Sequence, residues 1–314
     1  MFKRVLVPID RSEFAETVLA HLPRFINPAH TEIVLLGVVE TLRYAATAFE
    51  YAPILLNDLY ASYEVHLQTI QQQLSKAGYR VSTRLVEGDA TEQILEVAAH
   101  TYVDLIAMAT HGRGGVARWA LGSIAERVIQ NSTLPVLLVR KQTDMPHSKI
   151  ERILVPLDGS MLAEKALSSA QKVAKENGAE LLLFQTILSL DTRDEFVQNI
   201  SSQQLEDADA QAFTNAEAYL NGVALRMRGE GMACQIAVLR GDPARLICDV
   251  ANESKIDVVV ICTHGRTGFN RWVYGSVANQ VIRGVDCPVL VVRGVEPVEN
   301  KEPAKIGLGQ LSPA

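Results

Sequence analysis

Short runs of β-branched and aliphatic residues recur along this chain and alternate with longer amphipathic stretches. Continuous apolar runs of this length are typical of strands buried on both faces, as in a parallel sheet covered by helices. The alternation therefore predicts βα units joined by right-handed crossovers. In the first half we expect strands at 5–7, 32–39, 81–86, 105–108 and 136–139, and helices at 12–25, 57–77, 91–100 and 123–131.

The second half repeats this pattern. Residues 108–140 and 261–293 align without a gap and share Thr-His-Gly-Arg, Arg-Trp, Gly-Ser and Pro-Val-Leu. A repeat this long indicates a domain duplication. We expect a first domain at 1–142, a second at 150–294 and a disordered tail at 295–314. The predicted fold is α/β, with two tandem doubly wound, Rossmann-like domains, each built on about five mainly parallel strands. In the second half we expect strands at 153–155, 180–186, 234–239, 258–262 and 289–292, and helices from near 160, within 205–229 and from 243.

Composition narrows the function classes. The formal net charge is −6 and the sequence pI is about 5.7, so the chain lacks the basic footprint of a nucleic-acid or anionic-membrane binder. We find neither a signal-peptide pattern at the first residues nor an apolar stretch near the roughly 20 residues that span a bilayer. We therefore expect a cytoplasmic location. All four cysteines lie in the second half, where we expect them to fill small apolar gaps.

The segment after the fourth strand of each half is the candidate site. Loops at the carboxyl ends of parallel strands bind ligands in open α/β sheets, and a helix that begins there directs free N–H groups at them. Each feature also has a purely structural explanation: Ser123 with Glu126 fits a capping box, the glycines suit positive-φ turns, and the histidine suits a structural hydrogen bond. Their joint recurrence favours an anion or nucleotide site, although neither a P-loop nor a G-x-G-x-x-G after the first strand is present. The residues concerned are His111, Gly112, Arg113, Gly122 and Ser123, and then His264, Gly265, Arg266, Gly275 and Ser276.

These residues resemble the universal stress protein family, in a tandem arrangement. The family's nucleotide signature is Gly-x-x-Gly, nine residues, then Gly-Ser or Gly-Thr. This chain departs from it only at the first glycine, which is replaced by Ala109 and Cys262. The resemblance implies contacts with ATP, AMP or ADP, with Mg²⁺ as a candidate companion ion. The strand-one aspartates would hold adenosine, although Asp10 or Ser12 would equally cap the next helix. The implied contact residues are Pro8, Ile9, Asp10, Val38, Met108, Ala109, His111, Gly112, Arg113, Gly122, Ser123 and Ile124, and then Pro156, Leu157, Asp158, Thr186, Ile261, Cys262, His264, Gly265, Arg266, Gly275, Ser276 and Val277.

The leading functional hypothesis is adenine-nucleotide binding by a stress-response regulator without robust catalysis. The alternatives are slow ATP hydrolysis, with His111 or His264 positioning water, and a nucleotide-independent module that binds unidentified protein partners. The resemblance also implies that strands 136–139 and 289–292 pair the halves into an internal pseudo-dimer, and we expect further homodimerisation. We expect tighter binding in the first half, because Ala109 is smaller than Cys262.

Overall fold

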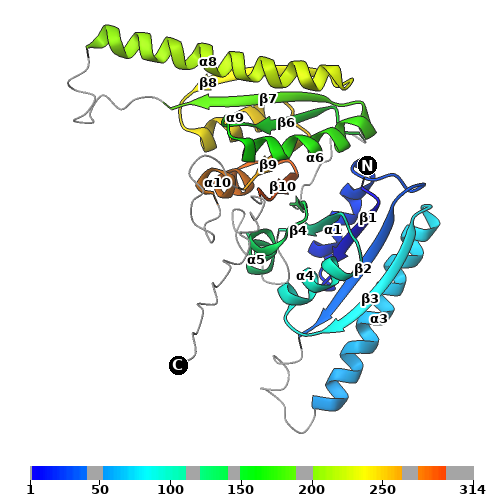
Figure 1. Cartoon of the computed structure of the whole chain (residues 1–314). Helices are drawn as coiled ribbons and strands as arrows, with labels where there is room; N and C mark the ends of the chain where they lie inside the picture. Colours follow the sequence, from blue (N-terminus) through cyan, green and yellow to red (C-terminus); the bar gives the residue numbers. More distant parts are fainter. Residues whose placement is uncertain are drawn as a thin grey trace, which may run out of the picture.

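The computed structural model describes residues 2–40, 52–110, 121–140, 149–188, 201–263 and 275–294. Both halves have the predicted alternation of strands and helices, so the predicted fold class is confirmed (Figure 1). The first half contains β1 (Arg4–Pro8), α1 (Glu13–His21), η1 (Leu22–Arg24), β2 (Glu32–Val39), α3 (Ala52–Lys76), β3 (Arg80–Glu87), α4 (Ala90–His100), β4 (Leu105–Ala109), α5 (Ser123–Asn131) and β5 (Val136–Val139). The second contains β6 (Arg152–Pro156), α6 (Met161–Asn177), β7 (Glu180–Ile187), α8 (Ser202–Gly229), β8 (Cys234–Arg240), α9 (Pro243–Glu253), β9 (Val258–Cys262), α10 (Ser276–Gly284) and β10 (Val289–Val292).

One sheet runs through both halves, in the order β3-β2-β1-β4-β5-β10-β9-β6-β7-β8. Neighbouring strands within each half are parallel, and the two halves meet where β5 pairs with β10 antiparallel. Leu138 lies opposite Val289 and Val136 opposite Val291 in that register. The edge pairing that the sequence predicted is therefore present, and it covers two apolar strands that would otherwise be open to pairing with other chains.

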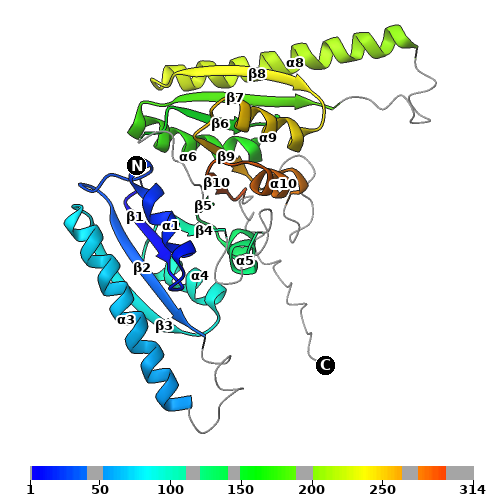
Figure 2. The ribbon, with the colours of Figure 1, turned by 180° about the vertical axis from the view of Figure 1, so that it is seen from behind.

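Helices cover both faces of this sheet. Residues of α1, α3, α6 and α8 form one apolar core with one face, and residues of α4, α5, α9 and α10 form another with the opposite face. The central strands β4, β5, β9 and β10 are buried along their whole length, which explains why they read as continuous apolar runs. Figure 2 shows the same layers from behind.

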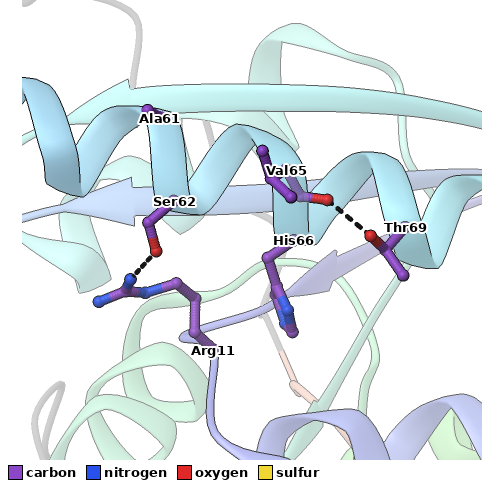
Figure 3. A pocket seen from close by; sticks show the side chains of 6 residues that line it. All are labelled: Arg11, Ala61, Ser62, Val65, His66 and Thr69. Carbon is purple, nitrogen blue, oxygen red and sulfur yellow. Dashed lines mark hydrogen bonds between the residues drawn. The ribbon is translucent and has the colours of Figure 1, made fainter.

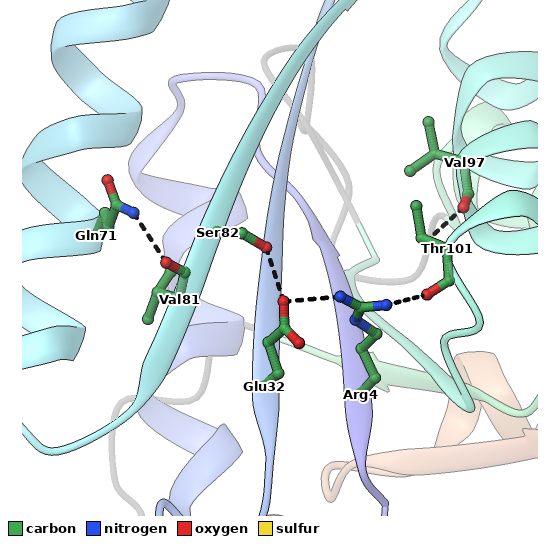
Figure 4. Close-up of polar contacts among 7 residues, drawn as sticks. All are labelled: Arg4, Glu32, Gln71, Val81, Ser82, Val97 and Thr101. Carbon is green, nitrogen blue, oxygen red and sulfur yellow. Dashed lines mark hydrogen bonds and ion pairs between the residues drawn. The ribbon is translucent and has the colours of Figure 1, made fainter.

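Polar groups fasten the amino ends of the first three strands (Figure 4). The Arg4 guanidinium donates to Glu32 Oε1 at 3.0 Å and to the Thr101 carbonyl oxygen at 2.7 Å. Ser82 Oγ donates to the same Glu32 oxygen at 3.1 Å, and Gln71 donates to a β3 carbonyl. The hydrogen bond from Arg4 is the main cause of the lowered pKa of Glu32. This network fixes the register of β1, β2 and β3 at the edge opposite the candidate site.

Side chains join the halves on the α1 and α6 face of the sheet as well. Arg24 Nη2 lies 2.7 Å from Asp257 Oδ1, with both side chains buried. The Asn27 amide donates to Glu176 at 3.0 Å, and the Asn177 amide donates to the Arg24 carbonyl oxygen at 2.9 Å. The junction between the halves therefore consists of a strand pair with specific polar contacts in the helix layer above it.

Candidate functional site

The first wall of the candidate site is the loop that follows β1. Ile9 is buried, and its N–H donates to the Leu36 carbonyl oxygen at 2.8 Å, which holds the loop against β2. Asp10 Oδ1 accepts a hydrogen bond from Ser12 N at 3.0 Å, while the Ser12 side chain caps α1 by accepting from Ala15 N. Of the two equally suited residues, Ser12 is therefore the cap, and Asp10 lies just outside the helix at the carboxyl end of β1.

The second half has the same geometry. Leu157 N donates to the Phe184 carbonyl oxygen at 2.8 Å, and Asp158 Oδ1 accepts from Ser160 N at 2.9 Å. Ser160 caps α6 by accepting from Ala163 N. The strand-one aspartates thus occupy corresponding positions at two crevices, each at the carboxyl edge of its own parallel strands, where open α/β sheets bind ligands.

The second wall is the start of α5, and here the capping-box interpretation is wrong. The N-cap is Gly122 rather than Ser123, and no side chain in the described part of the chain caps this helix. The cap of α10 is likewise Gly275, again without a side-chain hydrogen bond from the described residues. Ser123 and Ser276 are exposed in the first helical turn. First-turn N–H groups and a serine hydroxyl at a helix N-terminus are the groups that bind anions in other proteins.

Packing within the protein also accounts for glycine at the cap position, apart from any ligand. Gly275 N donates to the Thr263 carbonyl oxygen at 3.0 Å, and a Cβ atom at position 275 would lie 2.6 Å from that oxygen. Gly122 N makes the corresponding hydrogen bond to the Thr110 carbonyl oxygen at 2.7 Å. The φ of Gly122 is −64° and that of Gly275 is −53°, so neither needs the left-handed region, and at position 275 it is space that requires glycine. The Gly-Ser pair therefore holds the helix against the strand end in addition to any role toward a ligand.

The remaining described residues lie at or near the carboxyl ends of the same strands, or in the first turns of α5 and α10. Val38 and Thr186 are half-buried near the ends of β2 and β7, and Met108, Ala109, Ile261 and Cys262 are buried in β4 and β9. Pro8 and Pro156 end β1 and β6, and Ile124 and Val277 lie half-buried in the first turns of α5 and α10. His111, Gly112, Arg113, His264, Gly265 and Arg266 lie outside the described residues.

The cysteines pack as the sequence suggested. Cys234, Cys262 and Cys287 are buried and Cys248 is half-buried, all as free thiols. Burial raises the pKa of Cys287 to about 12, and it also raises the pKa values of Cys234 and Cys248. Thiols with raised pKa values are poor nucleophiles at neutral pH. Within the described ranges, no three His, Cys, Asp or Glu side chains converge as a metal site would require.

A groove beside the first crevice was not predicted from the sequence (Figure 3). It is open, has a volume of about 690 Å³, and lies between the loop after β1 and the middle of α3. None of the predicted site residues lines it. Its lining residues are Arg11, Ala61, Ser62, Val65, His66 and Thr69.

The family model for the universal stress protein family matches residues 1–140 and again residues 149–293. This chain belongs to the universal stress protein family. Universal stress protein MJ0577 of Methanocaldococcus jannaschii is 29% identical over 157 residues, which cover 45% of this chain and 97% of the relative. Universal stress protein Rv2005c of Mycobacterium tuberculosis is 26% identical over 219 residues, covering 68% of this chain and 69% of the relative.

A solved universal stress protein from Archaeoglobus fulgidus has the same fold over both halves. It covers 93% of this chain and 96% of its own, with a TM-score of 0.69 and 23% sequence identity. Two matches of the family model in one chain identify a tandem universal stress protein, as the repeat predicted. No helix in the described ranges combines the length and apolar character needed to cross a bilayer.

Proposed function

We propose that this universal stress protein binds adenine nucleotides, as ATP, ADP or AMP, at both crevices and acts as a regulator in a stress response. The observation that carries the proposal is that α5 and α10 each begin at a glycine cap, with an exposed serine in the first turn and no side-chain cap from the described residues, while the strand-one aspartate of each half lies before a helix that a serine caps. A helix N-terminus with free N–H groups stabilises a phosphate through hydrogen bonds and the helix dipole.

The proposal gives each residue a separate task. The N–H groups of the first turn and the hydroxyl of Ser123 or Ser276 would donate to phosphate oxygens. The carboxylate of Asp10 or Asp158 would accept hydrogen bonds from ribose hydroxyls, as an acidic side chain near the carboxyl edge of the sheet does in dinucleotide-binding α/β folds. The backbone near Val38 or Thr186 would contact the adenine. Mg²⁺ would enter with the nucleotide phosphates, because the ion commonly binds through them together with one or two carboxylates.

Denaturation of one sample releases any retained nucleotide, which mass spectrometry identifies. Calorimetric titration of the folded, nucleotide-free full chain with ATP, ADP and AMP then tests the proposal. A universal stress protein has been solved in complex with cAMP. Its TM-score to this chain is 0.35, too low to transfer the ligand, so cAMP is tested as a separate compound. Absence of heat and of retained nucleotide at millimolar concentrations would overturn the proposal.

Paired serine variants locate the site. Ser123→Ala removes one hydroxyl without disturbing a cap and should weaken ATP binding about tenfold if the hydroxyl donates to a charged phosphate. Ser276→Ala should do the same for the second crevice. The matched control is Ser75→Ala, an exposed serine near the end of α3 and far along the chain from either Gly-Ser pair. An equal effect from all three variants would place the nucleotide elsewhere.

The proposal includes a cytoplasmic location and a homodimer. Because β5 and β10 already pair within the chain, a second copy would have to use another surface. The outer strands β3 and β8, each at one end of the ten-stranded sheet, are such surfaces. Cell fractionation tests the location, and light scattering coupled to size-exclusion chromatography tests the dimer.

A further inference from the structure

The groove between the loop after β1 and the middle of α3 presents a fixed cation. Arg11 follows Asp10 directly, and its guanidinium lies 4.5 Å from the centre of the Tyr63 ring and donates a hydrogen bond to Ser62 Oγ. A guanidinium stacked on an aromatic ring and hydrogen-bonded at one nitrogen loses little further freedom when it binds a ligand. Within the described residues, no carboxylate forms an ion pair with Arg11, and its buried Nε has no hydrogen-bond partner there.

The backbone of Arg11 indicates that this cation is retained against a conformational cost. Its φ is +63°, in the left-handed region that residues with a Cβ rarely adopt. The corresponding residue of the second half is Gly159, with a φ of +84°. The turn therefore requires a left-handed residue, glycine meets that requirement without strain, and the first half nevertheless has arginine. Strain of this kind gathers at binding sites.

Two positions near Arg11 differ between the halves together with Arg11 itself. Tyr63 of α3, which supports Arg11, corresponds to Ala216 of α8, and Gly37 of β2 corresponds to Gln185 of β7. A Cβ at position 37 would lie 2.9 Å from Leu85, 3.0 Å from the Tyr63 ring and 3.1 Å from Leu67, so glycine here leaves room for the tyrosine and these two leucines. The second half has neither the guanidinium nor the ring beneath it. The cationic groove is therefore a feature of the first half.

The rest of the lining is apolar or weakly polar. Val65 is 63% exposed, an unusual exposure for a valine in a helix, and it lies in the groove with Ala61 and Thr69. His66 Nε2 lies 3.3 Å from Glu16 Oε1, so the imidazole stands between that carboxylate and the groove. The groove thus offers one cationic end, an imidazole and a short apolar floor.

We propose that this groove binds a small organic anion, with its carboxylate or phosphate group on Arg11 and its apolar body over Val65 and Ala61. Charge complementarity selects the anionic group, because Arg11 is the guanidinium that lines the groove without a carboxylate partner among the described residues. The volume of about 690 Å³ lies within the range of small-molecule sites. None of the residues assigned to the nucleotide lines this groove, and the proposal does not rest on the proposed nucleotide function.

The test uses the full chain and three matched probes: 1-naphthyl phosphate, 1-naphthoate and the neutral 1-naphthol. Binding is followed by the chemical shift of the Val65 methyl groups and by calorimetry. Both anions should bind with one site per chain and shift the Val65 signal, and 1-naphthol should bind at least about tenfold more weakly, since a charge-assisted hydrogen bond is lost. The phosphate-to-carboxylate ratio identifies the preferred anionic group. Equal binding of the neutral probe, or no binding of any probe, overturns the proposal.

Substitutions in the groove provide a second test of the proposed anion site. Arg11→Gly copies the residue of the second half, so the turn should keep its shape while affinity for both anions falls about tenfold. Val65→Glu adds a like charge at an exposed position and should weaken both anions similarly. Lys76→Gln, which removes an exposed cation from the end of the same helix, should change nothing. Saturating ATP should not displace the anions; displacement, or unchanged affinity in Arg11→Gly, overturns the proposal.

Discussion

Arg24 and Asp257 form a buried ion pair between the halves, with 2.7 Å between Arg24 Nη2 and Asp257 Oδ1. The other Asp257 oxygen accepts hydrogen bonds from the N–H groups of Glu151 at 2.8 Å and Arg152 at 3.1 Å. Asp104 makes the corresponding bonds to the first strand of its own half. One carboxylate thus ties β6 to β9 within the second half and connects both to the first half.

Arg24→Met should lower the free energy of unfolding by about 3–5 kcal/mol, because it leaves the buried Asp257 carboxylate without its cation. Urea unfolding at pH 7 measures the change. The control is Arg245→Gln, since Arg245 and Asp249 form an exposed pair at 3.6 Å whose loss should cost at most about 1 kcal/mol. Similar losses from both variants would show that burial does not decide the strength of this contact.

His21 should make stability depend on pH. Burial, together with the neighbouring Arg24 cation, lowers the pKa of His21 from its usual 6.5 to about 4. Between pH 6.5 and pH 4 the unfolded chain binds a proton at His21 that the folded chain does not. The contribution of neutral His21 to the free energy of unfolding is therefore fully present above pH 6.5 and is lost as the pH falls toward 4. Over the whole interval the loss should amount to about 3 kcal/mol.

The check is urea unfolding of wild type, His21→Leu and His30→Gln at pH 7 and pH 5. The leucine variant should lose less stability between the two pH values than wild type does. The exposed His30 serves as the control and should leave the wild-type difference intact. A leucine variant with the full wild-type pH dependence would assign the effect to other groups.

Gly275→Ala should destabilise the protein even in the absence of nucleotide. Its new Cβ would lie 2.6 Å from the Thr263 carbonyl oxygen, a backbone atom that cannot rotate away. Overpacking of this kind costs about 1–3 kcal/mol. Gly222→Ala is the matched control, because nothing lies within 4 Å of its Cβ position and the residue is inside α8, where alanine should stabilise by about 1 kcal/mol. Thermal unfolding of nucleotide-free protein should therefore shift in opposite directions.

The first crevice should bind ATP more tightly than the second. Ala109 lies where the second half has the larger Cys262, and forcing a larger side chain against a ligand costs about 1–3 kcal/mol, which corresponds to about 5- to 150-fold in affinity. Calorimetry of Ser123→Ala and Ser276→Ala measures the two sites without the steric problem that any substitution of Gly275 carries. The wild-type titration should show two phases, with Ser123→Ala weakening the tighter phase and Ser276→Ala the weaker one; a single wild-type phase, or the reverse assignment, would refute the asymmetry.

The sequence was sufficient to predict the strand and helix order, because long apolar runs report burial on both faces of a parallel sheet. It was insufficient for the cap of α5, although the predicted start of that helix at residue 123 is correct. Ser123 and Glu126 match a capping box, yet α5 begins at Ser123 itself, since Gly122 donates to the Thr110 carbonyl oxygen. That hydrogen bond depends on how the chain returns to the strand end, which local sequence does not encode.

Contacts between distant residues were also beyond the sequence. Arg24 and Asp257 are 233 positions apart, and Arg11 and Ser62 are 51 apart. Without the fold, each residue is one charged or polar side chain among many. A weak signal was present for Arg11, because the repeat aligns it with Gly159 in a turn after the first strand. A residue other than glycine at such a position can mark a strained turn.

The pairing of β5 with β10 inside one chain makes the union of the two halves independent of protein concentration. Two separate copies would part on dilution and would have to remain identical. Here each half always meets the same partner, so one can change without the other changing with it. Arg11, Tyr63 and Gly37 opposite Gly159, Ala216 and Gln185 show that it has done so. The two halves are therefore equivalent to the subunits of a permanent heterodimer. They can differ in function while they always occur in a one-to-one ratio.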